Sequence, residues 1–125
     1  MKRIEVIRSN TTRKGEATRG IARTRIFEDG NILVGRSHIG GGVESDWHHH
    51  GLREVYGFIL SGRLRFDYGR NGRGSIEART GDFFHIPSGL IHRDVNPDPK
   101  KEAVVVNFML GEGPAVLNMD DRQDT

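Results

Sequence analysis

Cysteine is absent from the 125-residue sequence. This absence excludes disulfide bonds and thiolate ligands, so any metal ion must be held by nitrogen and oxygen atoms. Long apolar segments are also missing, since no run approaches the roughly 20 residues needed to span a bilayer. The first ten residues, MKRIEVIRSN, contain no apolar signal core. We therefore expect a cytoplasmic protein that does not associate with a membrane.

The net charge is small, and large apolar side chains are scarce as well. The formal net charge at pH 7 is +2, and hydrophobic residues make up 34% of the chain. The chain does contain a local group of arginines: Arg63, Arg65, Arg70 and Arg73. Asp67 and Glu77 interrupt this group, and few aromatic residues accompany it for base stacking. A solvated hairpin face explains it better than a nucleic-acid site, so no nucleic-acid partner is expected.

Glycine is plentiful, with 17 residues, and indicates many turns. Short β-type segments recur between the turn signals, whereas no convincing helix is found. The expected strands cover residues 1–8, 21–27, 31–39, 54–60, 63–68 and 75–79, the two segments flanking Pro87–Gly89, and residues 102–110. The last of these is continuously apolar, which predicts burial on both sides. This pattern predicts a single all-β domain, a jelly-roll β-barrel.

One stretch of the chain, GVESDWHHHGLREVYGFILSG, contains three consecutive histidines. In an extended strand side chains alternate, so His48 and His50 point to one side and His49 to the other. Gly51 can bend the chain so that Glu54 returns to the side of His48 and His50. Neutral imidazoles with a carboxylate suit a divalent transition metal, although a polar loop is the alternative explanation of the three histidines.

A second stretch, GDFFHIPSGLIHRDVN, indicates two short strands around a Pro-Ser-Gly turn. Pro87 presets its own backbone angle, and Gly89 tolerates the positive angle that a tight turn often needs. His92 then arrives on the second arm of a hairpin, where it can face the histidines of the first stretch. Asp94 and Asn96 share the parity of His92 along this arm.

These stretches resemble the paired motifs of the cupin superfamily, G(x)5HxH(x)3-4E(x)6G and G(x)5PxG(x)2H(x)3N. The second motif matches at every fixed position: Gly81, Pro87, Gly89, His92 and Asn96. The first matches at Gly42, His48, His50 and Glu54, but seven residues rather than six separate Glu54 from Gly62. The extra residue indicates a β-bulge, which we place at Gly57, or a ligand shifted by one position.

The resemblance implies a small single-domain cupin of the cupin-2 type, an all-β jelly-roll β-barrel also called a double-stranded β-helix. The domain would cover residues 1–125, with a barrel core at about 21–111 and a polar C-terminal tail at 112–125. A barrel this small exposes sheet edges, and the resemblance further implies a homodimer, joined through sheet faces or exchanged N-terminal strands.

The resemblance also implies one divalent transition metal ion per chain: Fe, Mn, Ni, Co, Cu or Zn. Its ligands would be His48, His50, Glu54 and His92. This set leaves one or two positions open on a six-coordinate ion, as catalysis requires, but would close a four-coordinate zinc. Because imidazole must be neutral to coordinate, metal occupancy is expected to fall as the pH drops through roughly 6.

Two classes of function remain open. The first is a metal-dependent enzyme of dioxygenase or isomerase type acting on a small organic molecule, in which Tyr56, His85 or Arg36 could supply a proton or anchor a carboxylate. The second is a non-catalytic small-ligand-binding or sensor barrel. Tyr56 and Phe58 share the parity of Glu54, so they are expected either in the wall of the pocket or in the core.

Overall fold

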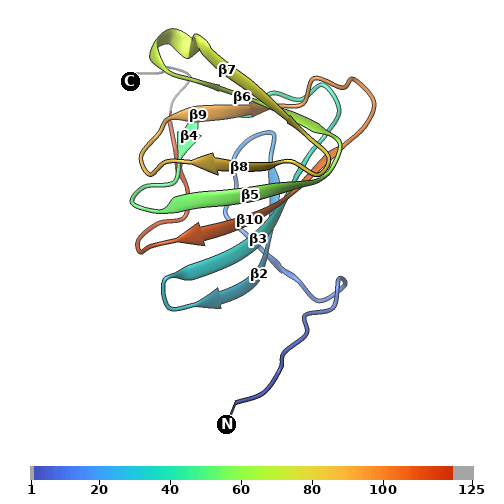
Figure 1. The fold of residues 1–125 in the computed structure, drawn as a ribbon, viewed down its shortest axis with the longest axis vertical. Helices are drawn as coiled ribbons and strands as arrows, with labels where there is room; N and C mark the ends of the chain where they lie inside the picture. Colours follow the sequence, from blue (N-terminus) through green and yellow to red (C-terminus); the bar gives the residue numbers. More distant parts are fainter. Residues whose placement is uncertain (1, 120–125) are drawn as a thin grey trace.

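Short strands are the main secondary structure of the chain in the computed structural model, which describes residues 2–119 (Figure 1). The strands are β1 Arg13–Lys14, β2 Ala22–Asp29, β3 Ile32–Ile39, β4 His48–His49, β5 Glu54–Ser61, β6 Arg63–Tyr68, β7 Gly74–Arg79, β8 Phe83–Ile86, β9 His92–Val95, β10 Ala103–Leu110 and β11 Leu117–Asn118. A 3-10 turn, η1 Arg70–Gly72, joins β6 to β7. Part of the expected C-terminal tail, residues 120–125, lies outside the described residues.

Two antiparallel sheets make up the barrel (Figure 1). One has six strands in the order β1-β2-β3-β10-β5-β8, and the other has five in the order β11-β4-β9-β6-β7. Strands distant in sequence become neighbours in this arrangement: β10 lies between β3 and β5, and β9 lies between β4 and β6. The predicted all-β jelly roll is confirmed.

The core lies between the two sheets and is filled by side chains from one face of each strand. Its most buried apolar members are Ile39, Val55, Ile59, Leu64, Ala103 and Val105. Along β5 the alternation is regular, since Val55, Gly57 and Ile59 point inward and are buried while Tyr56 and Leu60 are exposed. The inward face of β5 is therefore the one that does not carry Glu54.

Strand β10 alternates too, which corrects the expectation that it is buried on both sides. Val105 and Met109 are buried in the core, whereas Phe108 and Leu110 are 43% and 41% exposed on the outer face. The continuous apolar run led to the wrong expectation, because the outer face of the six-stranded sheet also carries apolar side chains.

The β-bulge of β5 lies near its end and not at Gly57. The register with β10 shifts between Val104 and Val105, whose partners are Ser61 and Ile59, so Leu60 is the extra residue. Gly57 pairs regularly and has a steric role, because a Cβ atom there would lie 2.0 Å from Cζ of Phe84. Glycine leaves the room that the Phe84 ring occupies.

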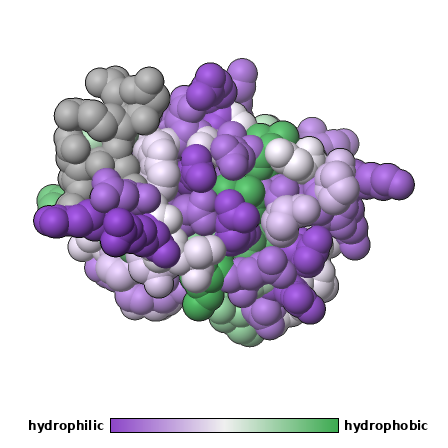
Figure 2. Space-filling model, turned by 90° about the horizontal axis from the view of Figure 1, so that it is seen from above, coloured by the Kyte–Doolittle hydropathy of each residue, from purple (hydrophilic) through white to green (hydrophobic). Residues whose placement is uncertain are grey.

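The N-terminal segment differs from expectation, since residues 2–8 form no strand and Ile4 is 93% exposed. Within the described part of the chain no helix is long and apolar enough to cross a membrane. The face seen from the side of β7 is largely hydrophilic, with hydrophobic residues gathered in a narrow band (Figure 2).

Candidate metal centre

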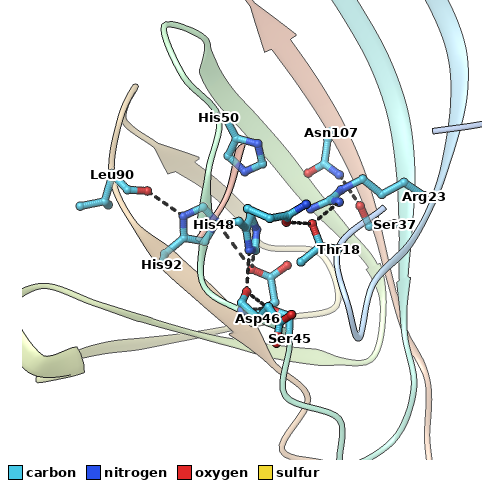
Figure 3. Close-up of polar contacts among 12 residues, drawn as sticks. Thr18, Arg23, Ser37, Ser45, Asp46, His48, His50, Leu90, His92 and Asn107 are labelled. Carbon is cyan, nitrogen blue, oxygen red and sulfur yellow. Dashed lines mark hydrogen bonds and ion pairs between the residues drawn. The ribbon is translucent and has the colours of Figure 1, made fainter. Parts of the chain in front are cut away.

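Three histidines converge inside the barrel: His48, His50 and His92, here called the three-histidine cluster. His48 on β4 is the cross-strand partner of His92 on β9, and His50 follows directly after β4 (Figure 3). One ring nitrogen from each lies within 4.8 Å of the others, and all three residues are buried. The structure thus brings together the three predicted histidines from stretches more than 40 residues apart in the sequence.

Backbone carbonyl groups orient all three rings. Each Nδ1 atom lies 2.9 Å from a carbonyl oxygen, that of Asp46 for His48, of Ala115 for His50 and of Leu90 for His92. A carbonyl only accepts hydrogen bonds, so each Nδ1 carries the hydrogen and donates it. Each Nε2 is consequently the unprotonated nitrogen, with its lone pair free to coordinate a metal ion.

Burial keeps these imidazoles neutral. It lowers the pKa of His48 well below the usual value, with the neighbouring His92 adding to the effect. Burial and the other two rings lower the pKa of His50 to about 3. The pKa of His92 is lowered by burial as well, although Asp94 opposes the shift. A cluster that resists protonation is suited to bind a cation.

Two charged side chains that sequence reasoning did not assign to the site also face the cluster. Oδ1 of Asp94 lies 3.7 Å from Nε2 of His92 and 3.9 Å from Nε2 of His48. Arg23 extends from β2 toward His48, and its guanidinium donates hydrogen bonds to Oγ1 of Thr18 (2.7 Å) and to the carbonyl oxygen of Glu16 (3.2 Å) (Figure 3). Burial lowers the pKa of Arg23, while the charge of Asp94 opposes this.

The parity shared by Asp94 and His92 was a usable signal for Asp94. No local sequence pattern identified Arg23 as a site residue, because β2 is brought to the cluster only by the tertiary fold.

The residues present fit a divalent transition metal. Among residues 2–119, Nε2 of His92 and Oδ1 of Asp94 are buried polar atoms without a hydrogen-bond partner. Buried polar groups are normally paired, and a lone pair next to a carboxylate is an environment that a cation satisfies. Imidazole nitrogen and carboxylate oxygen are ligands that such ions accept.

Glu54, the fourth expected ligand, lies outside the cluster. Its carboxylate accepts a hydrogen bond of 2.5 Å from Nε2 of His85 and one of 3.1 Å from the backbone N–H of Ser88. The hydrogen bond from His85 is the main cause that lowers the pKa of Glu54. Its neighbour Val55 is the inward residue and lines the cavity that holds the histidines. The structure therefore does not bring Glu54 to the histidines.

The residues considered for proton transfer or for the pocket wall lie elsewhere. Tyr56 and Phe58 do share the face of Glu54, but this is the outer face, where Tyr56 is 46% exposed and stacks on His85 at 4.6 Å. His85 borders a large outer cavity and does not reach the three-histidine cluster. Arg36 shares its parity on β3 with outward residues, since the buried neighbour is Ser37.

The middle one of the three consecutive histidines and the last motif residue have local roles. His49 does not join the cluster, and its Nδ1 accepts a hydrogen bond from the backbone N–H of Gly51. Asn96 is buried, donates hydrogen bonds to the carbonyl oxygens of Ile39 and Lys101, and accepts one from the N–H of Asp98. It stabilises the turn after β9.

Two cavities meet at His92. The inner one, of about 20 Å³, holds the three-histidine cluster with Arg23 and Asp94. The outer one, of about 590 Å³, opens between β8 and the β6–β7 hairpin and has a mainly apolar lining. Both share the lining residues Phe66, Phe84, Ile86 and His92. The inner volume suits an ion and one small group, whereas the outer volume is in the range of small-molecule sites.

Solved structures of known proteins have the same fold. A Klebsiella pneumoniae protein with a double-stranded β-helix domain has a TM-score of 0.73 at 15% identity, over 94% of this chain and 99% of its own. The polyketide cyclase RemF from Streptomyces resistomycificus has a TM-score of 0.75 at 14% identity, with coverages of 94% and 87%. Oxalate oxidase in complex with glycolate has a TM-score of 0.65 at 23% identity, covering 79% of this chain and 55% of that one.

No curated protein matches the sequence. The family described as Cupin domain matches residues 35–109. The match covers more than half of the chain and contains both histidine-bearing stretches, and the fold agrees with it; this protein therefore belongs to the cupin family.

Proposed function

We propose that this cupin is a metal-dependent enzyme of dioxygenase or isomerase type that acts on a small organic molecule. The observation that carries the proposal is the convergence of three neutral imidazoles, each oriented by a backbone carbonyl, beside an apolar cavity of about 590 Å³. A divalent transition metal ion held there by His48, His50 and His92 would supply Lewis-acid or redox chemistry to a substrate oxygen.

The surroundings of the cluster support an acidic or enolisable substrate. Arg23 places a fixed guanidinium in the inner cavity, where it can pair with a carboxylate or enolate oxygen. Phe66, Phe84 and Ile86 line both the outer and the inner cavity, so they would hold the apolar part of the substrate and exclude water. The similar solved structures include an oxalate oxidase in complex with glycolate and a polyketide cyclase.

Elemental analysis of protein purified without a polyhistidine tag tests the metal. We expect about one equivalent of a transition metal in the wild-type protein and its loss in His92→Ala. The matched control is His38→Ala, since His38 contacts Glu102 on the surface at 3.2 Å and is not in the cluster. Metal-free wild-type protein after exposure to all six candidate ions, or equal metal content in His92→Ala, would refute the proposal.

Turnover separates the enzyme from the alternative function. Iron-loaded protein should consume oxygen with at least one of a panel of diketones, catechols and 2-hydroxy acids, or convert an enolisable acid or sugar derivative to an isomer detectable by NMR. Tight binding of a panel member without conversion would favour the alternative, a non-catalytic small-ligand-binding or sensor cupin. The restricted inner cavity of about 20 Å³ suits such a ligand cradle equally well.

A homodimer is also part of the proposal. The outer face of the six-stranded sheet exposes the apolar side chains of Ile32, Tyr56, Phe83, Phe108 and Leu110. Pairing of two such faces would bury a surface that solvent otherwise contacts. Light scattering that gives 14.0 kDa at every concentration would refute the dimer. The cytoplasmic location stays a prediction.

A further inference from the structure

One ionisable group inside the barrel, Asp94, has a buried carboxylate oxygen that no hydrogen bond satisfies among residues 2–119. Asp94 follows His92 by two positions on β9, so both side chains point into the barrel. The Asp94 side chain is only 12% exposed, and its Oδ1 is a buried atom without a hydrogen-bond partner among the described residues. A buried carboxylate oxygen without a hydrogen bond is costly, so Oδ1 calls for a cation or a donor in addition to the Arg23 charge in the same cavity.

The fold also supplies a reason why a carboxylate from β9 is needed. On β5, which carries the expected carboxylate ligand, the residue that faces the three-histidine cluster is Val55. Glu54 points outward and is already satisfied by His85 and Ser88. Since the bulge falls at Leu60, beyond these residues, it does not turn Glu54 inward. The β5 wall of the cavity is therefore apolar.

The position of Asp94 matches that of a ligand. Two atoms that share a tetrahedral zinc ion, each about 2.1 Å from the metal, lie about 3.4 Å apart. Oδ1 of Asp94 lies 3.7 Å and 3.9 Å from the Nε2 atoms of His92 and His48, within about 0.5 Å of that separation.

The backbone of Asp94 is held in place independently of any ion. Its N–H donates a hydrogen bond of 2.9 Å to Oγ of Ser45, and its carbonyl oxygen accepts one of 2.8 Å from the N–H of Ser45. Arg23 lines the same inner cavity, so a guanidinium lies near the carboxylate. The carboxylate is thus preorganised beside the lone pairs of the histidines.

We propose that Asp94, and not Glu54, completes the metal site. The protein ligands are then His48 on β4, His50 directly after β4, and His92 and Asp94 on β9. This inference rests on the proposed function, because it presupposes that the three-histidine cluster binds a metal ion. With three neutral imidazoles and one carboxylate, the four ligands together carry a single negative charge. Arg23 lies in the same cavity and is the cation that an anionic substrate could contact.

Zinc affinity of the full chain, measured by competition with a chromophoric chelator, tests the proposal. Loss of a residue that only hydrogen-bonds a metal ligand lowers the metal affinity by roughly 10 to 100-fold. We expect Asp94→Ala to lower the zinc affinity by more than this, because Asp94 would itself be a ligand. Asp94→Asn, which keeps the shape and one oxygen, should fall between Asp94→Ala and the wild type. Glu54→Gln should bind zinc within about twofold of the wild type, because its carboxylate contacts only the edge strand and the following turn.

A crystal structure of the zinc-loaded wild-type protein tests the proposal without any substitution that could impair folding. We expect an Asp94 oxygen at about 2.0 to 2.2 Å from the ion, together with three imidazole nitrogens. Zinc bound by the three histidines with both Asp94 oxygens beyond about 3 Å, or with Glu54 as ligand, would overturn this inference while leaving the proposed function intact. A wild-type protein that binds no zinc or other transition metal would overturn both.

Discussion

The Nδ1 atom of His50 lies 2.9 Å from the carbonyl oxygen of Ala115, a residue 65 positions later in the chain. Ala115 is buried in the core, and the strand that follows it, β11, pairs with β4, which contains His48. Part of the segment expected to be a polar tail therefore closes the site. The C-terminal region both orients one metal-binding ring and supports the strand that carries another.

Removal of this segment should weaken metal binding. A chain that ends at Gly113 loses the acceptor for His50 and the partner strand of β4, and we expect its zinc affinity to fall by about 10 to 100-fold. The measurement is chelator competition on protein whose far-ultraviolet circular dichroism shows an intact fold. A chain that ends at Met119 keeps both contacts and serves as the control. Equal affinities of the two truncated proteins would contradict this role of the Ala115 carbonyl.

Gly57→Ala should destabilise the protein through a steric clash. The new Cβ atom would lie 2.0 Å from Cζ of Phe84, a ring that lines both cavities. Displacement of this ring should cost about 1 to 3 kcal/mol of unfolding free energy, measured by urea denaturation. Gly40→Ala is the matched control, because its nearest side-chain atom, Cγ2 of Val43, lies at 3.4 Å.

A double-mutant cycle checks the cause of that effect. The cost of Gly57→Ala should become smaller when Phe84 is replaced by leucine, whose shorter side chain can move out of the way. Full additivity of the two substitutions would mean that the strain lies elsewhere in β5.

Several features of the fold were predictable because they depend on local signals. Strand β6 has the predicted limits of residues 63 and 68, and β3 starts one residue late. The two histidine-bearing stretches were found because metal-ligand spacing and turn residues are short-range patterns. Parity along a strand also held, since Tyr56 and Glu54 do share a face.

What failed depended on partners that the sequence does not display. Parity says which residues share a face but not which face is inside, so it could not show that Val55, and not Glu54, lines the inner cavity. Alternation in residues 1–8 predicted a strand, but residues 2–8 find no partner strand in the fold. Arg23 reaches the cluster only because the fold brings β2, which lies between β1 and β3, to the inner cavity near Thr18, and no spacing in the sequence records this.

Asp67 should contribute stability that depends on its charge. It lies on β6 opposite Arg93 of β9, next to the position that pairs with His92, and it accepts hydrogen bonds of 2.8 and 3.1 Å from Arg65 and of 3.0 Å from Arg93. We expect Asp67→Asn to lower the free energy of unfolding by about 1 to 3 kcal/mol, measured by urea denaturation at pH 7. Glu77→Gln is the control, since its partner Arg79 is 72% exposed and such surface pairs contribute little.

The pH dependence of the free energy of unfolding tests whether the charge of the Asp67 carboxylate causes this stabilisation. Burial alone would raise the pKa of Asp67, but the hydrogen bonds from the two arginines outweigh it and the net pKa is lowered. Its contribution is therefore present above the unfolded pKa of about 3.9 and is lost as the pH falls below that value. Asp67→Asn should lose this part of the acid sensitivity, and a wild-type acid transition retained in the variant would contradict the assignment.

The metal-free protein should lose stability as the pH falls below about 6.5, because of the three-histidine cluster. Burial lowers the pKa of all three imidazoles in the folded state, that of His50 to about 3, whereas the unfolded chain takes up protons near 6.5. Between these values the unfolded state binds more protons, so the free energy of unfolding falls with falling pH by up to about 1.4 kcal/mol per pH unit for each imidazole. For the same reason bound metal should be retained below pH 6, which revises the expectation from the sequence that metal occupancy falls as the pH drops through roughly 6.

Thermal unfolding of the metal-free protein between pH 7.5 and 5 measures this dependence. His50→Gln removes one of the titrating groups, so its melting temperature should change less steeply with pH than that of the wild type. His38→Gln should retain the wild-type slope, because His38 lies at the surface beside Glu102 and outside the cluster. If all three proteins showed the same slope, the acid sensitivity would have to come from groups other than the buried imidazoles.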